Sequence, residues 1–200
     1  DDSSEGSETL RLTAANLAGT TDAANSTIVD NGTAAIFLGN NTTITPNTPD
    51  DTDPNGPDFP IYLDDDRPIS VNDIAVNEAS PFAVFTVSGN IGQVIRLNLI
   101  DGTAKVGNTA TDGTEDYKAP LQISVDDGAV WADYTANDDY TLTAATFLVR
   151  ASLINDTSYE GQEGFALEAT RVSQDDKTYG LASIYDDGTG VIFNEDGTED

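Results

Sequence analysis

Oxygen-bearing side chains recur at alternate positions in one short segment of this chain. Asp51, Asp53 and Asn55 have D-x-D-x-N spacing, and Gly56 follows them. Alternate oxygen ligands and a glycine that permits a sharp turn are typical of the first half of a calcium-binding loop. The twelfth position, which normally supplies a bidentate Glu, is Tyr62. The candidates to replace that Glu are Asp58, Asp64, Asp65 and Asp66.

This segment belongs to a stretch, residues 39–66, that is rich in Asn, Thr, Pro and Asp. Such a composition is typical of a loop or a linker, because prolines and short polar side chains favour turns. Two interpretations stay open. One is an ordered loop braced by calcium, and the other is a solvated acidic linker between modules.

The composition of the chain excludes several classes of site. Its 200 residues include 36 acidic and 8 basic ones, for a formal net charge of −28, and there is no Cys, His or Met. Disulfides, Ser-His-Asp and Cys-His nucleophiles, His/Cys zinc sites and haem ligated by His, Met or Cys are therefore excluded. Nucleic acid is excluded as a partner because phosphate binding needs clustered Lys and Arg. We expect Ca²⁺ held by Asp and Glu to replace disulfides as the staple of an extracellular fold.

Short alternating runs with β-branched and aromatic residues dominate the chain, and no segment has a convincing amphipathic helical period. Turn signals such as Asp101-Gly102 and Asp187-Gly188 separate the runs. The sequence therefore predicts an all-β fold of the sandwich class. The expected strands are residues 10–12, 33–38, 69–76, 82–87, 94–100, 121–125, 141–151, 164–169, 180–185 and 190–193.

Two parts of the chain are copies of each other. Residues 5–14 match residues 160–169, and residues 28–33 match residues 184–189. The residue numbers differ by 155 in the first pair (160 minus 5) and by 156 in the second (184 minus 28), so an insertion or deletion of one residue separates the blocks. Repeats of this kind indicate an array of modules. We expect residues 1–38 to be tail strands of a preceding repeat docked on a main domain at residues 67–200.

Four segments follow the order of the Calx-β family. They are Val76-Asn77-Glu78, Asp101-Gly102-Thr103-Ala104, Glu115-Asp116-Tyr117 and the run from Asn155 to Phe165. This order resembles the pattern V-x-E, D-G-T-A, D-Y and D-x(3)-E-x-x-E-x-F, and it spans about residues 68–193. The resemblance implies an immunoglobulin-like β-sandwich, stapled by Ca²⁺ at one end.

The same resemblance implies a set of metal ligands. The matching positions are Glu78, Asp116, Asp156, Glu160 and Glu163. Asp186 and Asp187 are expected to close the site from the far edge, and Asp101 is either a further ligand or part of a plain turn. Asn155 stands where calcium-sensing members carry another Asp, which implies that one of their ion sites is weak or absent here.

A second resemblance is to modules of the giant RTX adhesins of Gram-negative bacteria, including ice-binding ones. It is carried by residues 147–150, 155–161 and 184–190, together with the Asp126–Trp131 turn. Such adhesins are secreted to the bacterial surface and stiffened by calcium. Their peptide-binding domains imply a module that grips free C-termini of cell-surface proteins with the help of Ca²⁺.

An acidic protein binds an acidic ligand only through a bridging cation, and aromatic side chains nearby would then shape the site. The candidate ligand-binding residues are Trp131, Tyr134, Asn137, Asp138, Asp139 and Tyr140. For Trp131 the alternative is a tryptophan buried in the sandwich.

Three functions remain in view. We expect a calcium-dependent adhesion module for peptide C-termini, and the alternatives are a passive calcium-rigidified extender or a calcium-dependent carbohydrate-binding module. An enzyme is not expected, because nothing marks one pair of carboxylates as catalytic. Direct membrane insertion is not expected either, because no apolar run reaches the roughly 18 residues of a span.

Overall fold

The computed structural model describes residues 5–30, 36–37, 43–44, 66–107 and 115–200. The chain divides into two compact units, Asp1–Arg67 and Pro68–Asp200. This division lies one residue from the expected start of the main domain at residue 67. The docking of residues 1–38 on that domain, and their origin in a preceding repeat, stay predictions.

The first unit contains two antiparallel pairs of strands. Strand β1 (Glu8–Ala15) pairs with β2 (Thr21–Ile28) along its whole length. Strand β3 (Ile36–Phe37) pairs with β4 (Thr43–Ile44). Every residue of β1 and β2 is exposed, although both strands carry aliphatic side chains.

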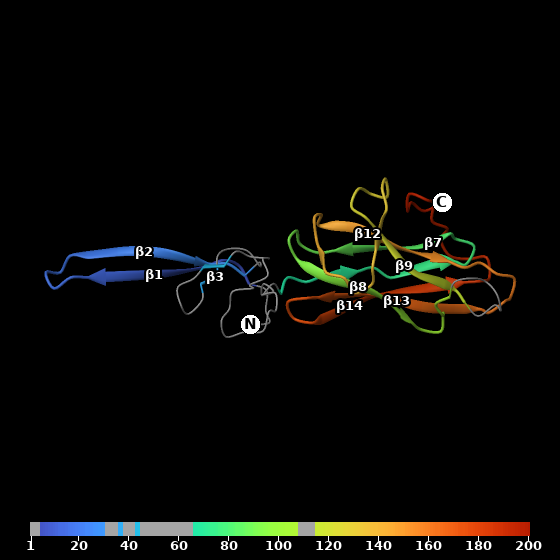
Figure 1. Ribbon diagram of the computed structural model, residues 1–200, viewed down its shortest axis with the longest axis horizontal. Helices are drawn as coiled ribbons and strands as arrows, with labels where there is room; N and C mark the ends of the chain where they lie inside the picture. Colours follow the sequence, from blue (N-terminus) through green and yellow to red (C-terminus); the bar gives the residue numbers. More distant parts are fainter. Residues whose placement is uncertain (1–4, 31–35, 38–42, 45–65, 108–114) are drawn as a thin grey trace. The chain divides into compact units, whose positions relative to one another are not determined.

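The second unit is a sandwich of two five-stranded sheets (Figure 1). The first sheet has the order β10-β9-β12-β7-β5, and the second has the order β11-β8-β13-β14-β6. Strands of the first sheet are β5 (Ser70–Val71), β7 (Phe82–Ser88), β9 (Tyr117–Ser124), β10 (Ala132–Tyr134) and β12 (Thr146–Leu153). Strands of the second are β6 (Ile74–Asn77), β8 (Val94–Asp101), β11 (Tyr140–Thr141), β13 (Gln162–Arg171) and β14 (Asp176–Tyr185).

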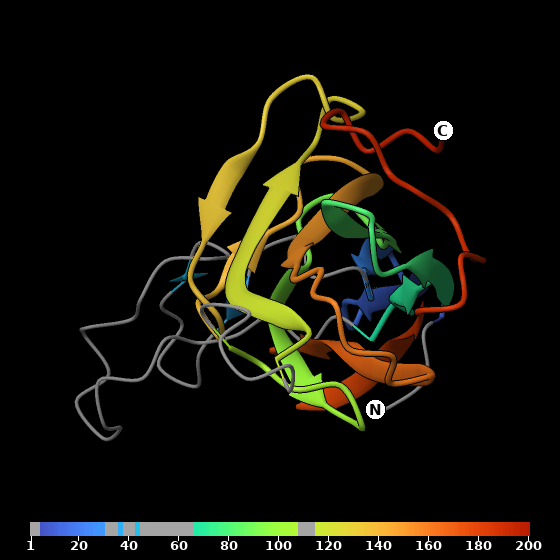
Figure 2. The same ribbon diagram turned by 90° about the vertical axis from the view of Figure 1, so that its right-hand side faces the viewer.

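The expected fold class is confirmed: the described residues form strands and turns, and the second unit is a β-sandwich. Most neighbours are antiparallel, but β6 runs parallel to β14. Figure 2, which views this unit roughly along its strands, shows the two sheets facing each other across the core. No described helix is long and apolar enough to cross a membrane.

Alternating apolar residues form the core between the sheets. In β13 the side chains of Phe165, Leu167 and Ala169 are buried, and in β8 those of Ile95 and Leu97 are buried. Burial of these alternate apolar residues is the period-2 pattern that the sequence predicts. The ring of Phe165 stacks on Tyr117 with centroids 4.2 Å apart and meets Phe85 edge-on at 6.0 Å.

Strand β7 is buried on both faces, as its continuous apolar run indicates. Ala83, Phe85 and Val87 are fully buried, and Val84 on the opposite face is only 4% exposed. The second cover comes from the C-terminal segment: a Cβ on Gly197 would lie 3.4 Å from Val84 and 3.1 Å from Trp131.

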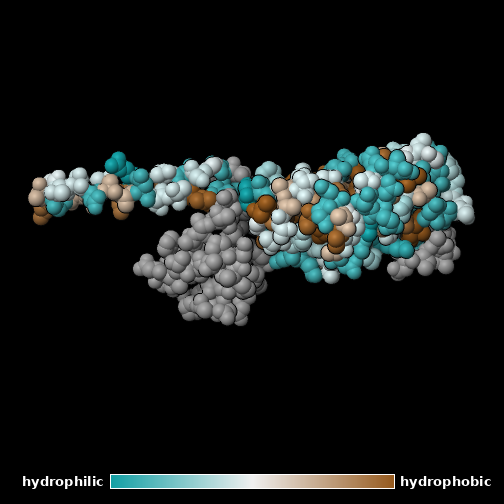
Figure 3. Space-filling model, turned by 90° about the horizontal axis from the view of Figure 1, so that it is seen from above, coloured by the Kyte–Doolittle hydropathy of each residue, from teal (hydrophilic) through white to brown (hydrophobic). Residues whose placement is uncertain are grey.

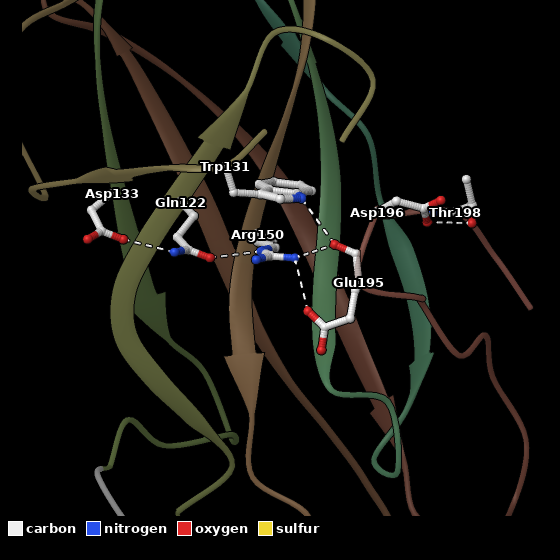
Figure 4. A network of polar contacts seen from close by, with 7 residues as sticks. All are labelled: Gln122, Trp131, Asp133, Arg150, Glu195, Asp196 and Thr198. Carbon is white, nitrogen blue, oxygen red and sulfur yellow. Dashed lines mark hydrogen bonds and ion pairs between the residues drawn. The ribbon is translucent and has the colours of Figure 1, made fainter. Parts of the chain in front are cut away.

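Arg150 ties this C-terminal segment to the first sheet (Figure 4). Its guanidinium lies 3.9 Å from the ring centroid of Phe82 and 4.1 Å from that of Trp131. It donates hydrogen bonds to Gln122 Oε1 at 2.9 Å and to the carbonyl oxygen of Glu195 at 2.6 Å. Because a buried cation needs partners, this network fixes the segment as well as the arginine.

Replacing Phe165 by Ala should cost about 3–5 kcal/mol of stability, because the substitution leaves a cavity beneath two aromatic rings. Urea unfolding monitored by circular dichroism measures this loss. Leu181→Ala, on the neighbouring strand β14 and 56% exposed, is the control and should cost about 0.5 kcal/mol or less. Equal losses in the two variants would contradict this account of the core.

Candidate metal centre

Several acidic side chains lie together at one end of the sandwich. Gln162, at the start of β13, pairs with Tyr185, at the end of β14, and Tyr185 also pairs with Asn77 at the end of β6. The residues just beyond these strand ends therefore meet. Glu78 follows β6, and Asp186 follows β14.

Three carboxylates form the tightest group of acids in the described part of the chain. Asp116, Glu160 and Glu163 each offer one oxygen atom, and these oxygens all lie within 4.8 Å of one another. Asp116 is buried, Glu163 is partly buried and Glu160 is exposed. Two oxygens bound to one Ca²⁺ lie at most about 5 Å apart, because each Ca–O distance is about 2.3–2.6 Å. The spacing thus fits a hard cation.

Backbone amides orient the neighbouring acids. Glu78 accepts a hydrogen bond at 3.0 Å from the amide of Asp156, and Asp186 accepts one at 3.1 Å from the amide of Glu160. Asp116 accepts a further bond at 2.7 Å from the amide of Lys105. The loops between strands thus fix these carboxylates at the same end of the sandwich.

Burial and like charge act together on this group. Burial raises the pKa of Glu78 to about 7, and the carboxylates of Asp186 and Asp156 add to the shift. Burial also raises the pKa of Glu163 to about 7, with a hydrogen bond and repulsion from Asp116 as further causes. The pKa of Glu160 is raised as well, by burial first and then by its acidic neighbours.

The donor set fits a divalent cation. Within the described part of the chain, the ion pairs of Lys and Arg are with other acids: Asp139, Glu195, Asp176 and Glu168. Closely packed carboxylates with raised pKa values and no cationic side chain are relieved by a bound metal ion, whose charge favours their ionised forms.

Asp101 and Asp187, two of the sequence-based candidates, have local roles. Asp101 accepts a hydrogen bond at 2.5 Å from the Tyr117 hydroxyl and another at 3.3 Å from the amide of Val106. Asp187 accepts two bonds from Thr189, from its amide at 2.9 Å and from its hydroxyl at 2.5 Å. Both carboxylates lie outside the group of three described above.

Of the candidate ligands in the acidic loop at residues 39–66, the structure describes one. Asp51, Asp53, Asn55, Asp58, Asp64 and Asp65 lie outside the described residues. Asp66 is described, and it is only 5% exposed. A calcium site in this loop stays a prediction.

The aromatic loop predicted to bind a ligand packs along the edges of the sheets. Tyr134 and Tyr140 contact each other edge-on at 6.3 Å and pack against the core. The Tyr134 hydroxyl donates to the carbonyl of Asp138 and accepts from the amide of Leu97. Asn137 adopts a positive φ of 66°, and its amide donates to the carbonyl of Leu97. These contacts hold the loop in place.

This loop and the acidic cluster do not share one site. Tyr140 pairs with Ile95 near the start of β8, whereas Asp101 ends that strand. At about 3.3 Å per residue, the two ends are about 20 Å apart. Asp139 forms an ion pair with Arg96 at 2.6 Å, and Trp131 donates its indole N–H to the Glu195 carbonyl at 3.1 Å.

A groove beside the cluster is absent from the sequence-based candidates. It has a volume of about 410 Å³, and Asp101 and Glu163 line it together with apolar side chains. Ile100, Ala166 and Leu181, which are direct cross-strand partners on β8, β13 and β14, form its apolar wall. The available signal was the outward-facing apolar residues on strands whose other face forms the core.

This chain was compared with known proteins, and it is similar to several solved structures. No protein-family model matches the chain, and no curated protein does. The apo-form Calx CBD1 domain has a TM-score of 0.39 at 18% identity, covering 60% of this chain and 97% of that one. The calcium-binding domain CBD12 of CALX1.1 has a TM-score of 0.41 at 16% identity, covering 60% of this chain and 44% of that one.

A further similarity is to the E. coli chaperone DraB. Its TM-score is 0.32 at 8% identity, with 60% of this chain and 56% of that chain covered. Identities and TM-scores this low do not assign a family or a function. The chemistry of the site therefore depends on the residues described above.

Without Ca²⁺, the stability of the protein should fall as the pH rises from about 4.5 to about 7. The folded-state pKa values of Glu78 and Glu163 lie above their ordinary value of 4.5, so the folded chain binds more protons than the unfolded chain in this interval. Their stabilisation is complete below about pH 4.5 and is lost as the pH passes about 7. Thermal unfolding in chelator across this range measures the effect.

Added Ca²⁺ should raise the melting temperature more at pH 7 than at pH 5, because the metal binds the ionised carboxylates. The double variant Glu78→Gln/Glu163→Gln is the control, and in chelator its melting temperature should depend less on pH. A chelated wild-type protein that gains stability relative to this variant between pH 5 and 7 would refute the assignment.

Proposed function

We propose that this chain is a calcium-dependent adhesion module that binds the free C-terminus of a peptide or cell-surface protein. The observation that carries the proposal is a juxtaposition. The group Asp116, Glu160 and Glu163 has the spacing of a cation site, and Glu163 also lines the apolar groove.

Calcium binding is the first step of the argument. Asp116, Glu160 and Glu163 would hold one ion, and Glu78, Asp156 and Asp186 would supply ligands at its edge or to a second ion. Ca²⁺ takes six to eight oxygen ligands, and three carboxylates leave positions for water or for an incoming oxygen. The ion would offset the burial and the repulsion that together raise the pKa values of Glu78 and Glu163.

Capture of a carboxylate is the second step. A chain with a net charge of −28 repels an acidic ligand unless a cation bridges the two. A C-terminal carboxylate at the ion would place the last side chains of the peptide near Glu163, where the groove begins. Ile100, Ala166 and Leu181 offer those side chains an apolar wall. Apolar pockets with a few polar groups at one end are typical ligand sites.

The setting of this activity is the third part of the proposal. A chain without cysteine that depends on Ca²⁺ for its rigidity suits a secreted protein at a bacterial surface, where bound calcium can take the place of disulfides. The passive-extender alternative is favoured by one observation, the repeated hairpin in the first unit. An extender would need Ca²⁺ for stiffness and would bind nothing in the groove.

The test is a binding screen of the labelled protein in Ca²⁺ and in chelator. The array carries peptides with free C-termini, the same peptides amidated, and glycans. We expect calcium-dependent signal on the free C-termini and loss of that signal on amidation. Binding that persists in excess chelator would refute the proposal. Binding to glycans alone would establish a lectin, and no binding to any member of the array would establish an extender.

Two test variants, each with a control variant, locate the peptide site. Glu163→Gln should weaken peptide binding at least about 10-fold, since it removes a charged ligand of the ion, whereas Asp133→Asn, near Gln122 on β9, should leave binding unchanged. Ala166→Tyr, which fills the groove, should weaken peptide binding without lowering calcium affinity. Asn98→Tyr, on the same outward face of β8, is the matched control. Equal effects of the last two would exclude the groove.

A further inference from the structure

The hairpin of the first unit has the same register as the last hairpin of the second. In β1–β2, Glu8 pairs with Ile28, and in β13–β14, Glu163 pairs with Ile184. The sequence matches put Glu8 on Glu163 and Ile28 on Ile184, so both strands correspond residue by residue. The extra residue lies in the turn, between Arg171 and Asp176.

A hydrogen bond at the base of the hairpin is also repeated. The amide of Glu5 donates to Asp30 Oδ2 at 2.6 Å, and the amide of Glu160 donates to Asp186 Oδ2 at 3.1 Å. These are equivalent positions in the two copies. Because the bond links a loop residue to an acid beyond the second strand, it is independent of the strand pairing. The two hairpins are therefore the same structural element.

The two hairpins differ in the exposure of their equivalent apolar side chains. Phe165, Leu167 and Ile184 are 2%, 0% and 4% exposed in the second unit. Their counterparts Leu10, Leu12 and Ile28 are 61%, 71% and 57% exposed. Figure 3 shows apolar residues at the surface of the hairpin of the first unit.

In the second unit, neighbouring strands and the opposite sheet bury the apolar face of the β13–β14 hairpin. Strand β8 pairs antiparallel with β13, β6 pairs parallel with β14, and the opposite sheet covers the apolar side. Among the described strands, β1 and β2 pair only with each other. An isolated two-stranded hairpin is only marginally stable in water, and burial of its exposed aliphatic side chains would stabilise it.

We propose that the face formed by Leu10, Leu12 and Ile28 binds the first strands of a module with the fold of residues 68–200. One strand of that module would add to β1 as β8 adds to β13, and another would add to β2 as β6 adds to β14. The partner is a module that has its early strands and takes β1–β2 as its last hairpin. A second copy of residues 68–200 does not fit, because β13–β14 already occupies that place.

The docking would also assemble a second acidic cluster. Glu5, Glu8 and Asp30 stand at the positions of Glu160, Glu163 and Asp186, so the hairpin brings half of the arrangement described above. The partner would supply the equivalents of Glu78, Asp116 and Asp156. This inference does not depend on peptide binding by the second unit.

The experiment extends the chain at its N-terminus. Residues 68–159 are joined in front of Glu5, so that their strands meet β1–β2 at the junction that normally joins residues 159 and 160. Amide hydrogen exchange is measured by NMR, and β13–β14 in the same molecule serves as the internal reference. We expect protection of β1–β2 amides to rise on the order of 100-fold or more over the unextended chain, because they join a cooperative unit.

Matched substitutions test the face. Leu12→Asp in the extended chain should return the β1–β2 amides to fast exchange, whereas Arg11→Asp on the opposite side should not. Amides that exchange as fast as in the unextended chain overturn the proposal. So does self-association of the unextended chain that Leu12→Asp abolishes, because the occupant would then be a second copy.

A second measurement tests the proposal even if the strands added at the N-terminus do not fold correctly. In the full chain, residues 160–186 are replaced by a second copy of residues 5–30. A cooperative unfolding transition of the altered module, with its tyrosine and tryptophan signals intact, supports the equivalence of the hairpins. A module that is unfolded at 25 °C in Ca²⁺, while Phe165→Leu alone leaves it folded, rejects it.

Discussion

Repulsion between carboxylates at one end of the sandwich is the constraint on which the other features of the second unit depend. The strands that build the core also bring Asp116, Glu160 and Glu163 within 4.8 Å of one another. A fold that buries acids and also forces them together raises the pKa values of Glu78 and Glu163, through loss of hydration first and through the neighbouring carboxylates second. A bound divalent cation would turn the same arrangement into a staple, and in the function proposed above the same residues would serve both stability and ligand capture.

On the outer face of the first sheet, groups of the protein itself balance a buried charge. There a single buried cation, Arg150, lies between two aromatic rings and bonds to the Glu195 carbonyl. Its partners come from the protein itself, so this face needs no ion. Trp131 belongs to that network, which accounts for its place beside the C-terminal segment.

Much of the fold could be predicted from the sequence. Alternating apolar residues indicated the strands, and the run at β7 indicated burial on both faces. The acids brought together by the structure are those that the family pattern implied, because each follows or precedes a strand whose end is fixed by pairing.

The sequence could not show where one run of residues changes sheet. Residues 69–76 and 141–151 each read as one strand, but each divides between the two sheets, as β5 and β6 and as β11 and β12. At the first crossing, Asn72 Oδ1 accepts the amide of Thr86 at 2.6 Å and Asp73 Oδ1 accepts that of Leu181 at 2.8 Å. The groove was also hidden, because Ile100, Ala166 and Leu181 meet only through cross-strand register.

The parallel pairing of β6 with β14 has a mechanical meaning. Val76 also bridges in parallel to Val191, so β6, the second strand of the unit, lies alongside both β14 and the C-terminal segment. A pull that separates β6 from these neighbours along the strand axes would load several hydrogen bonds at once rather than one after another. Glu78 and Asp186 sit at the end of the same pairing, so an ion between them would lock the strands that carry the load. Because forced unfolding is governed by the rate of unfolding, separation of this pairing would then be the step that sets the resistance of the unit to force.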